Sequence, residues 1–189
     1  MPLELPLRTD RLTLRLHALD DDAALLDYYS RPQVARYLLD EPWDESTART
    51  RIRQHAAKDG LDGPMGALAV VVELEGRVVG DVTVWRTDRL HRRAEMGWVF
   101  SPDVAGRGVA AEACRALIPH LFKDHGLQRI EAQMDERNTA SARLAERLGM
   151  TREAVFRENW WNKGEWTSTV VYGLTRGDVL RWPEWAALG

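Results

Sequence analysis

Two glycines one residue apart, Gly106 and Gly108, occur where this sequence could bind a phosphate group. They follow a strand-like run at residues 95–100 and a loop containing Pro102, and an alanine-rich stretch that should be helical comes next. The free N–H groups at the start of a helix and the helix dipole favour an anion, and glycines let the backbone approach it. The sequence therefore predicts an anion-binding turn at residues 106–110.

Asn138 and Ser141 begin the helix after the next predicted strand. Asn138 suits an N-cap, and capping alone would explain it. The functional alternative is that both side chains also face the ligand held by the glycine turn. Both lie where the C-terminal ends of two strands should open onto one crevice, which is the usual ligand position in such sheets. The two interpretations stay open at this stage.

The elements that must position these residues follow from periodicity and turn signals. The expected order is β-α-α-β-β-β-α-β-α-β-β, which is an α/β (α+β) class with a mixed sheet and helices on both faces. Pro119 should disturb the helix that follows the glycines. One domain over residues 1–189 is expected. The strands are expected at 11–17, 68–74, 78–85, 95–100, 129–134, 151–160 and 165–174. The helices are expected at 22–29, at 44–58, from the glycines to about 125 and at 138–149, with a short helical piece near 34–38 and a tail at 175–188 that begins as a helix.

Composition excludes several classes of function. The balance of 26 Lys+Arg against 29 Asp+Glu gives no reason to expect nucleic-acid binding. No apolar run reaches the roughly 20 residues that span a bilayer, and the start lacks the regions of a signal peptide, so we expect a cytoplasmic protein without a membrane partner. Cys114 is expected to be a buried core thiol. The five histidines show no ligand spacing, so no metal site is expected.

Short motifs spread along nearly the whole chain support a family resemblance. In their order and spacing they resemble the GNAT superfamily of N-acetyltransferases and, within it, the RimJ/RimL-like subgroup that acetylates α-amino groups of ribosomal proteins. The resemblance implies a GNAT fold and transfer of an acetyl group from acetyl-CoA to a primary amine. One departure is Ala105, where the family pattern has Gln or Arg. The motifs are TDRLTLR at 9–15, EMGWV at 95–99, GRGVAAEA at 106–113, RIEA at 129–132, NTAS at 138–141 and ERLGM at 146–150, with 157–158 and 164–166 completing them.

The resemblance also implies how acetyl-CoA is held. The pantetheine arm would lie along the central strand like an added strand, using backbone groups of Trp98, Val99 and Phe100. Since the pyrophosphate pocket is made of backbone, it should survive the change at Ala105. The pyrophosphate would rest on backbone N–H groups of Gly106, Arg107, Gly108, Val109 and Ala110.

Catalysis requires a neutral amine and a proton donor for the departing thiolate. Glu95 is the candidate base, directly or through water, and its alternative is a surface salt bridge. The tyrosine that many family members use as the acid is replaced by Ala145, so the resemblance points to Ser141 as donor or relay. Asn138 would hydrogen bond the pantetheine or the base. A backbone N–H near Val99 would hold the oxyanion.

The acceptor, a protein N-terminus, peptide or small amine, would lie between the first helices and the last hairpin. Trp43, Trp160 and Trp161 are candidates for its pocket. Core packing is the default for the strand tryptophans Trp85, Trp98, Trp160 and Trp161. A homodimer is a further expectation, and the acyl donor could be longer than acetyl-CoA.

Two other functions are weighed against the transferase. Gly106, Gly108 and Ala111 fit a dinucleotide-binding fingerprint, with Glu131 twenty residues further on. However, five residues separate the strand from the first glycine, and no second βαβ half follows. The other alternative is a non-catalytic module that binds acyl-CoA.

Overall fold

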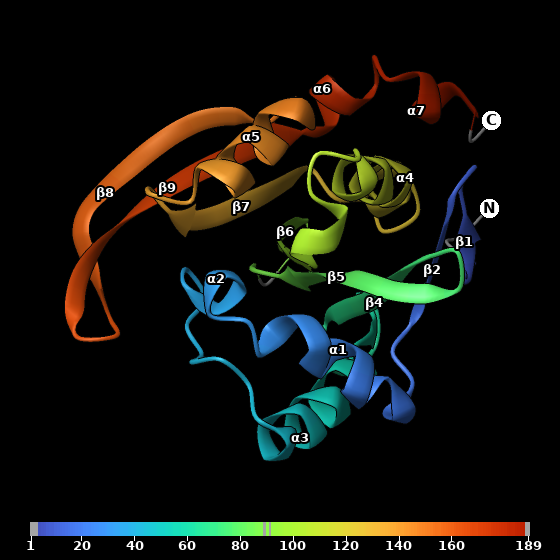
Figure 1. The fold of residues 1–189 in the computed structure, drawn as a ribbon. Helices are drawn as coiled ribbons and strands as arrows, with labels where there is room; N and C mark the ends of the chain where they lie inside the picture. Colours follow the sequence, from blue (N-terminus) through green and yellow to red (C-terminus); the bar gives the residue numbers. More distant parts are fainter. Residues whose placement is uncertain (1–3, 89, 91, 188–189) are drawn as a thin grey trace.

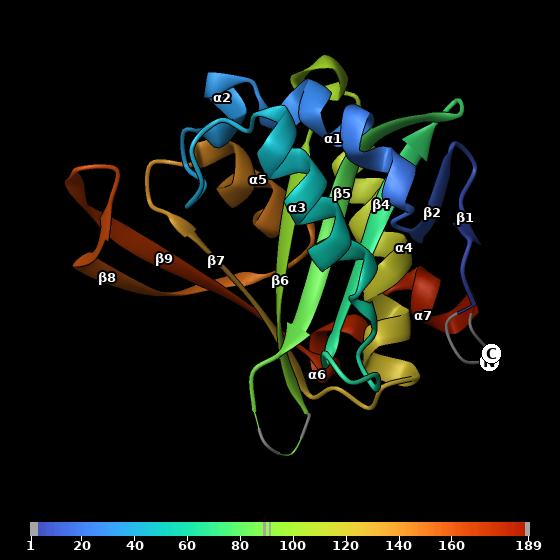
Figure 2. The same cartoon turned by 90° about the horizontal axis from the view of Figure 1, so that it is seen from below.

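The computed structural model describes residues 4–88, 90 and 92–187, and all its strands belong to one twisted sheet (Figures 1 and 2). The strand order is β1-β2-β4-β5-β6-β7-β9-β8, with β3 paired to β4. Among the described strands only β6 and β7 pair in parallel. The strands are β1 (Leu7–Arg8), β2 (Leu12–Leu16), β3 (Asp59–Gly60), β4 (Ala67–Leu74), β5 (Arg77–Arg86), β6 (Arg93–Phe100), β7 (Arg129–Asp135), β8 (Thr151–Asn162) and β9 (Glu165–Thr175).

Helices cover both faces of this sheet, as predicted (Figure 1). α4 packs on one face over the larger core, with α5 beside it, and α1 and α3 cover the other face over a smaller core. The helices are η1 (Leu19–Asp21), α1 (Asp22–Tyr29), α2 (Pro32–Ala35), α3 (Glu45–Ala56), η2 (Pro102–Val104), α4 (Val109–Lys123), α5 (Thr139–Arg147), α6 (Arg176–Val179) and α7 (Pro183–Ala187).

The predicted order of the long elements is confirmed, and so is the mixed α/β class. The short helical piece expected near residues 34–38 overlaps α2, and the helical start expected for the tail corresponds to α6. The elements that the prediction lacks are β1, β3, η1 and η2, and such short pieces carry too little periodicity to be seen in a sequence. α4 is continuous from Val109 to Lys123 with Pro119 inside it, so the helix is not reset at this residue. Pro119 is buried against the core, and this packing holds the helix together where propensity alone would weaken it.

The last hairpin, β8–β9, corrects the expectation for two tryptophans. Trp160 and Trp161 are 50% and 59% exposed, so neither packs into the core. β8 is an edge strand, and almost all its residues face solvent. An aromatic run predicts a strand, but whether a layer covers that strand depends on the rest of the fold.

Candidate active site

The glycine turn lies between η2 and α4, as the sequence predicts. Gly106 and Gly108 have φ angles of 74° and 77°, in the left-handed region that L side chains rarely adopt. Gly108 is the N-cap of α4, so the free N–H groups of the first turn of the helix begin here. Ala105, Gly106 and Arg107 are exposed. The turn therefore presents bare backbone to solvent, which suits a pyrophosphate.

Side chains from the segment between β1 and β2 contact the start of α4 and hold it in place, and the sequence motifs did not reveal these contacts. Glu112, in the first turn, pairs with Arg11 at 2.6 Å and accepts from the Thr9 hydroxyl at 2.5 Å. Arg11 also donates to the backbone carbonyl of Arg107 at 3.2 Å. These contacts hold the glycine turn from outside. Within the turn, the Arg107 N–H donates to the Val104 carbonyl at 3.3 Å, so that amide, one of the predicted pyrophosphate donors, already has a partner.

β6 and β7 separate along their length, and this opens the site. Their parallel ladder ends at the pair Glu95–Glu131, while β6 continues to Phe100. The backbone of β6 beyond Glu95 is therefore not paired with β7, as the proposed strand-like binding of pantetheine requires. Trp98 and Phe100 pack toward the larger core, whereas Val99 packs against the smaller one.

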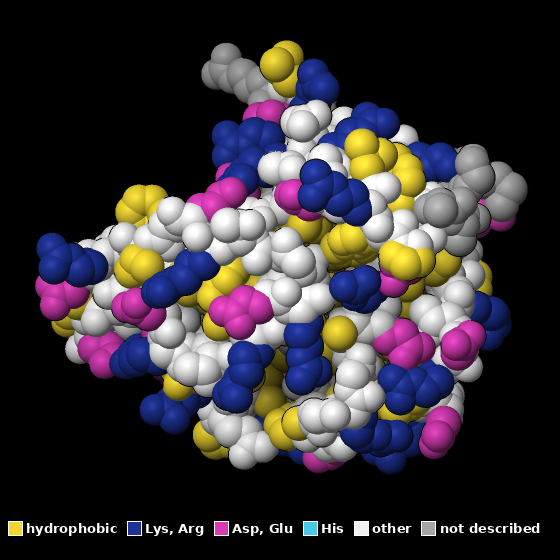
Figure 3. Space-filling model, turned by 90° about the horizontal axis from the view of Figure 1, so that it is seen from above, with side chains coloured by type: hydrophobic (Ala, Val, Ile, Leu, Met, Phe, Trp, Pro, Cys, Tyr) yellow, Lys and Arg dark blue, Asp and Glu magenta, His cyan; other side chains and the backbone are white. Residues whose placement is uncertain are grey.

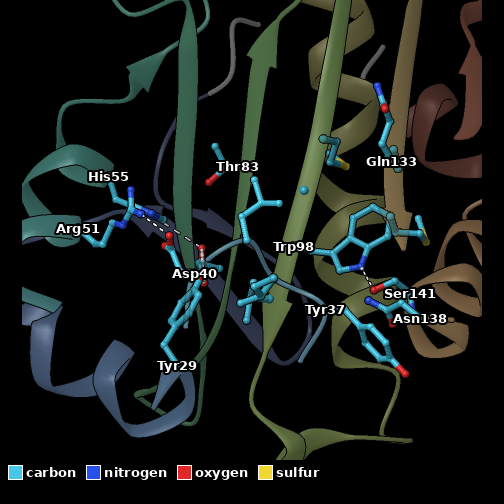
Figure 4. Close-up of a pocket in the computed structure, with 18 of the residues that line it drawn as sticks. Tyr29, Tyr37, Asp40, Arg51, His55, Thr83, Trp98, Gln133, Asn138 and Ser141 are labelled. Atoms are coloured by element: carbon cyan, nitrogen blue, oxygen red, sulfur yellow. Dashed lines mark hydrogen bonds and ion pairs between the residues drawn. The ribbon is translucent and has the colours of Figure 1, made fainter. Parts of the chain in front are cut away.

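Asn138 and Ser141 lie across this opening, at the start of α5 (Figure 4). Asn138 is the N-cap, and its side chain accepts from the Ser141 N–H at 3.1 Å, so the capping interpretation is confirmed. The Trp98 indole Nε1–H donates to the Ser141 hydroxyl at 3.2 Å. Because that contact uses an acceptor lone pair of the hydroxyl, the proton of Ser141 is left to point elsewhere.

Glu95 sits at the point where β6 and β7 part. Gln133 donates to its carboxylate at 3.3 Å. Burial, with a smaller contribution from the nearby Glu131 carboxylate, raises the pKa of Glu95 to about 6. A carboxylate with this pKa is ionised at pH 7 and more basic than an ordinary glutamate.

A cavity of about 410 Å³ opens beside the gap between β6 and β7, lined by residues of α1, α3, the central strands and the start of α5. Trp43 lines it and stacks on Tyr29 with ring centroids 3.8 Å apart. Trp160 and Trp161 do not line this cavity, so the structure brings only the first of the three predicted tryptophans to it. The residues around the cavity include Tyr29, Tyr37, Asp40, Arg51, His55, Lys58, Asp81, Thr83, Trp85, Gly97, Trp98, Val99, Gln133, Asn138 and Ser141 (Figure 4).

A buried polar cluster at this cavity was missed by sequence reasoning. Asp81, on β5, is 2% exposed and accepts hydrogen bonds from the hydroxyls of Tyr28 at 2.8 Å and Tyr29 at 3.1 Å. Burial raises its pKa to about 7. His55 lies beside it, with Nδ1 3.8 Å from the Asp81 carboxylate, and His17 is next to His55.

The histidines show no ligand spacing in the sequence, yet the fold brings two of them together beside Asp81. His17, His55 and Asp81 have polar atoms within 4.8 Å of one another. That spread exceeds the roughly 3.3 Å between ligand atoms in a tetrahedral zinc site with bonds of about 2.0–2.1 Å. We therefore interpret the cluster as a polar environment for Asp81. His91, another of the five histidines, lies outside the described residues.

Comparison with known proteins identifies the family to which this chain belongs. Residues 11–151 match the family model of the acetyltransferase (GNAT) domain, so the chain belongs to the GNAT family. The N-acetyltransferase p20 of Bacillus licheniformis, itself uncharacterised, is 32% identical over 171 residues, which cover 90% of this chain and 96% of p20. A GNAT acetyltransferase structure from Bacillus anthracis has a TM-score of 0.80 at 28% identity and covers 89% of this chain and 97% of its own.

The protein is thus an acetyl-CoA-dependent N-acetyltransferase that transfers the acetyl group to an amine. This sets aside the oxidoreductase and the non-catalytic module. A structure of RimL, a ribosomal L7/L12 α-N-protein acetyltransferase, in complex with coenzyme A has a TM-score of 0.77, with coverage of 90% of this chain and 97% of RimL. At 18% identity this likeness shows the fold alone. No helix among the described residues is long and apolar enough to cross a membrane.

Proposed function

We propose that the acceptor is the α-amino group of a peptide or protein, as in RimJ/RimL-like enzymes. An α-amino group with a pKa of about 7.7–8.0 is partly neutral at pH 7, whereas a lysine amine near 10.4 is almost wholly protonated. A base of modest strength therefore suffices. The observation that carries the proposal is Glu95, whose pKa burial raises to about 6 and whose carboxylate accepts from Gln133, a residue of the cavity lining.

The charges around the cavity favour one amine over a polyamine. Asp40 is paired with Arg51 at 2.5 Å, so its charge is balanced within the cavity wall. Lys58 lies near Asp81, the other acid of the lining. A polyamine carries several positive charges and would need a surplus of acids, which this lining does not offer.

The remaining roles follow from the positions of the side chains. Glu95 is four residues from Val99 on β6, or about 13 Å along the strand, so it acts through water if the thioester carbonyl binds near Val99. Ser141 supplies or relays the proton to the departing thiolate. Asn138 uses its oxygen to cap α5 and keeps its NH₂ group for the pantetheine.

An acceptor panel tests this function. Acetylation of a peptide with a free N-terminus is compared with an N-blocked peptide that contains one lysine, and with spermidine, by mass spectrometry. We expect the free α-amino group to give the highest kcat/KM at pH 7. Preference for spermidine or for the lysine peptide would refute the proposed acceptor class. A longer acyl-CoA in the same assay tests the donor.

We also propose that the chain acts as a single cytoplasmic domain that forms a homodimer. Large apolar side chains are exposed on the β8–β9 hairpin, and edge strand β8 offers unpaired backbone groups. Basic and acidic side chains are interspersed over the face in Figure 3, which supports the expectation that nucleic acid is not a partner. Light scattering of the purified protein tests the dimer, and a monomeric mass would contradict it. The exposed residues on the hairpin are Val155, Phe156, Trp160, Trp161 and Trp166.

A further inference from the structure

The acid closest to the proposed thioester position is Asp81. Asp81 on β5 and Val99 on β6 are direct partners in the antiparallel ladder. Paired residues put their side chains on the same face with Cα atoms about 4.5–5.5 Å apart. Both residues line the acceptor cavity. Glu95, by contrast, pairs with Trp85, four positions away along both strands.

The surroundings of Asp81 suit the recognition of an ammonium group. An ammonium has three N–H donors and needs acceptors. The Asp81 carboxylate provides one, and the Nδ1 atom of His55, 3.8 Å away, has no hydrogen-bond partner. Burial lowers the pKa of His55 to about 4, so its ring is neutral at pH 7 and one nitrogen accepts.

Hydroxyl groups hold Asp81 in place on the side away from the cavity opening. Tyr28 is fully buried, does not line the cavity, and donates to Asp81 Oδ1. Tyr29 donates to the same carboxylate while its ring stacks on Trp43 in the cavity wall. The carboxylate therefore has a fixed position. The titratable and charged groups that face it are Tyr28 and Tyr29 from α1, His55 and Lys58 from α3 and the residues after it, and His17 after β2, with the Asp40–Arg51 pair further along the cavity.

We propose that Asp81 binds the protonated acceptor amine and removes its first proton before the transfer begins. This rests on the proposed function and adds a step to it. An ammonium has three protons, and the amide product keeps one. Asp81 takes the first and becomes a neutral carboxylic acid, which later releases that proton to solvent. The neutral amine attacks the thioester carbon, the C–S bond breaks, and the second proton passes through Glu95 and Ser141 to the thiolate sulfur.

The assignment of one proton transfer to Asp81 and another to Glu95 explains why the site contains two acids. With a pKa raised by burial to about 7, Asp81 exchanges a proton with an α-ammonium group at little cost near neutral pH. Glu95, with a pKa of about 6, stays ionised to accept the proton of the transfer step. At high pH the amine arrives neutral, and Asp81 is no longer needed for its proton.

The test is the pH dependence of kcat/KM for the peptide with a free N-terminus, from pH 6 to 10. In Asp81→Asn, kcat/KM at pH 7 should fall about 100-fold or more, as for the loss of a general base, and recover toward wild type above about pH 8–9, where an α-amine is neutral. Glu95→Gln should stay impaired across the range. Asp124→Asn, which replaces another buried carboxylate far from the cavity, is the control. A loss in Asp81→Asn that is the same at every pH, or no loss, would overturn the proposal.

Tyr28→Phe keeps the inference testable if Asp81→Asn does not fold. It removes one hydrogen bond to the ionised carboxylate, which raises the pKa of Asp81 and should move the acidic limb of the profile to higher pH. An acidic limb at the wild-type pH in the folded Tyr28→Phe variant would refute the proposed role of Asp81.

Activity that is lost on dialysis against EDTA and restored by Zn²⁺ would also overturn the proposal, since the cluster of His17, His55 and Asp81 would then hold a metal. If the wild type prefers spermidine, the acceptor proposal fails, yet profiles measured with spermidine still decide the role of Asp81, with recovery of Asp81→Asn then expected only near the lysine-like pKa of about 10.4 and the pH range extended to cover it.

Discussion

Replacing Gly108 tests whether the turn before α4 binds the diphosphate of acetyl-CoA. Gly108 has a φ of 77°, and a Cβ added there meets only the tip of the Arg11 side chain, at 3.8 Å. The cost of a substitution is therefore backbone strain and not crowding. An L residue in the left-handed region costs about 1–2 kcal/mol, and a β-branched residue costs more.

The strain energy of a residue with a side chain at position 108 lowers either the stability of the fold or the affinity for coenzyme A. If Gly108→Ala keeps the native turn, the whole 1–2 kcal/mol lowers the free energy of unfolding. If the turn relaxes instead, coenzyme A must restore it, and the same energy weakens binding by about 5- to 30-fold. The two losses together should come to about 1–2 kcal/mol. Gly108→Val, which is β-branched, should abolish measurable binding.

Urea unfolding and calorimetric titration with coenzyme A measure the two losses. Gly76→Ala is the matched control, because Gly76 has a φ of 76° with nothing near its added Cβ, and it lies in the β4–β5 turn. It should lose stability while the affinity for coenzyme A stays normal. Wild-type affinity for coenzyme A together with wild-type stability in Gly108→Val would refute the reasoning.

Three further predictions concern Glu95, Ser141 and Cys114. The kcat of the wild type should rise as the pH increases through about 6, because Glu95 loses its proton there. In Glu95→Gln this rise should be absent and kcat should fall about 100-fold, while coenzyme A binds normally. An unchanged pH profile of kcat would remove Glu95 as the base. Ser141→Ala should lower kcat more than it changes KM for acetyl-CoA, measured by thiol release, and equal kcat values would argue against a proton donor at this position. Cys114 is fully buried, and burial raises its thiol pKa to about 12, so a thiol reagent should label it only in urea; rapid labelling of the native protein would contradict its burial.

The turn and strand proposed to bind acetyl-CoA have a geometry that could be predicted from the sequence because it is local. The central strand, the glycine turn and the start of α4 are consecutive in the chain, and their function depends on backbone conformation. Glycine spacing and strand composition report that conformation directly. Asn138 was also predicted as a cap, because an N-cap is recognised within one helical turn.

The acceptor half could not be predicted in the same way. Asp81 is 26 residues from His55 and 52 from Tyr29, and only the pairing of β5 with its neighbours and the packing of α1 and α3 bring them together. In the sequence, Asp81 looks like one polar residue in an otherwise apolar strand. Its role depends on which layer covers that face of the sheet, which is long-range information.

The two halves of the site also rest on different parts of the fold. The larger core fixes α4 and the glycine turn, whereas the smaller core, built from α1, α3 and the Trp43 loop, forms the wall of the acceptor cavity. They meet at β5 and β6, where Val99 packs against the smaller core and its strand neighbours Trp98 and Phe100 pack against the larger one. The cavity lining also includes Trp98, Val99, Asn138 and Ser141, so the two proposed halves share these residues, and only the wall built by α1 and α3 belongs to one half alone. Substitutions in that wall should therefore change the acceptor more than they change the binding of acetyl-CoA.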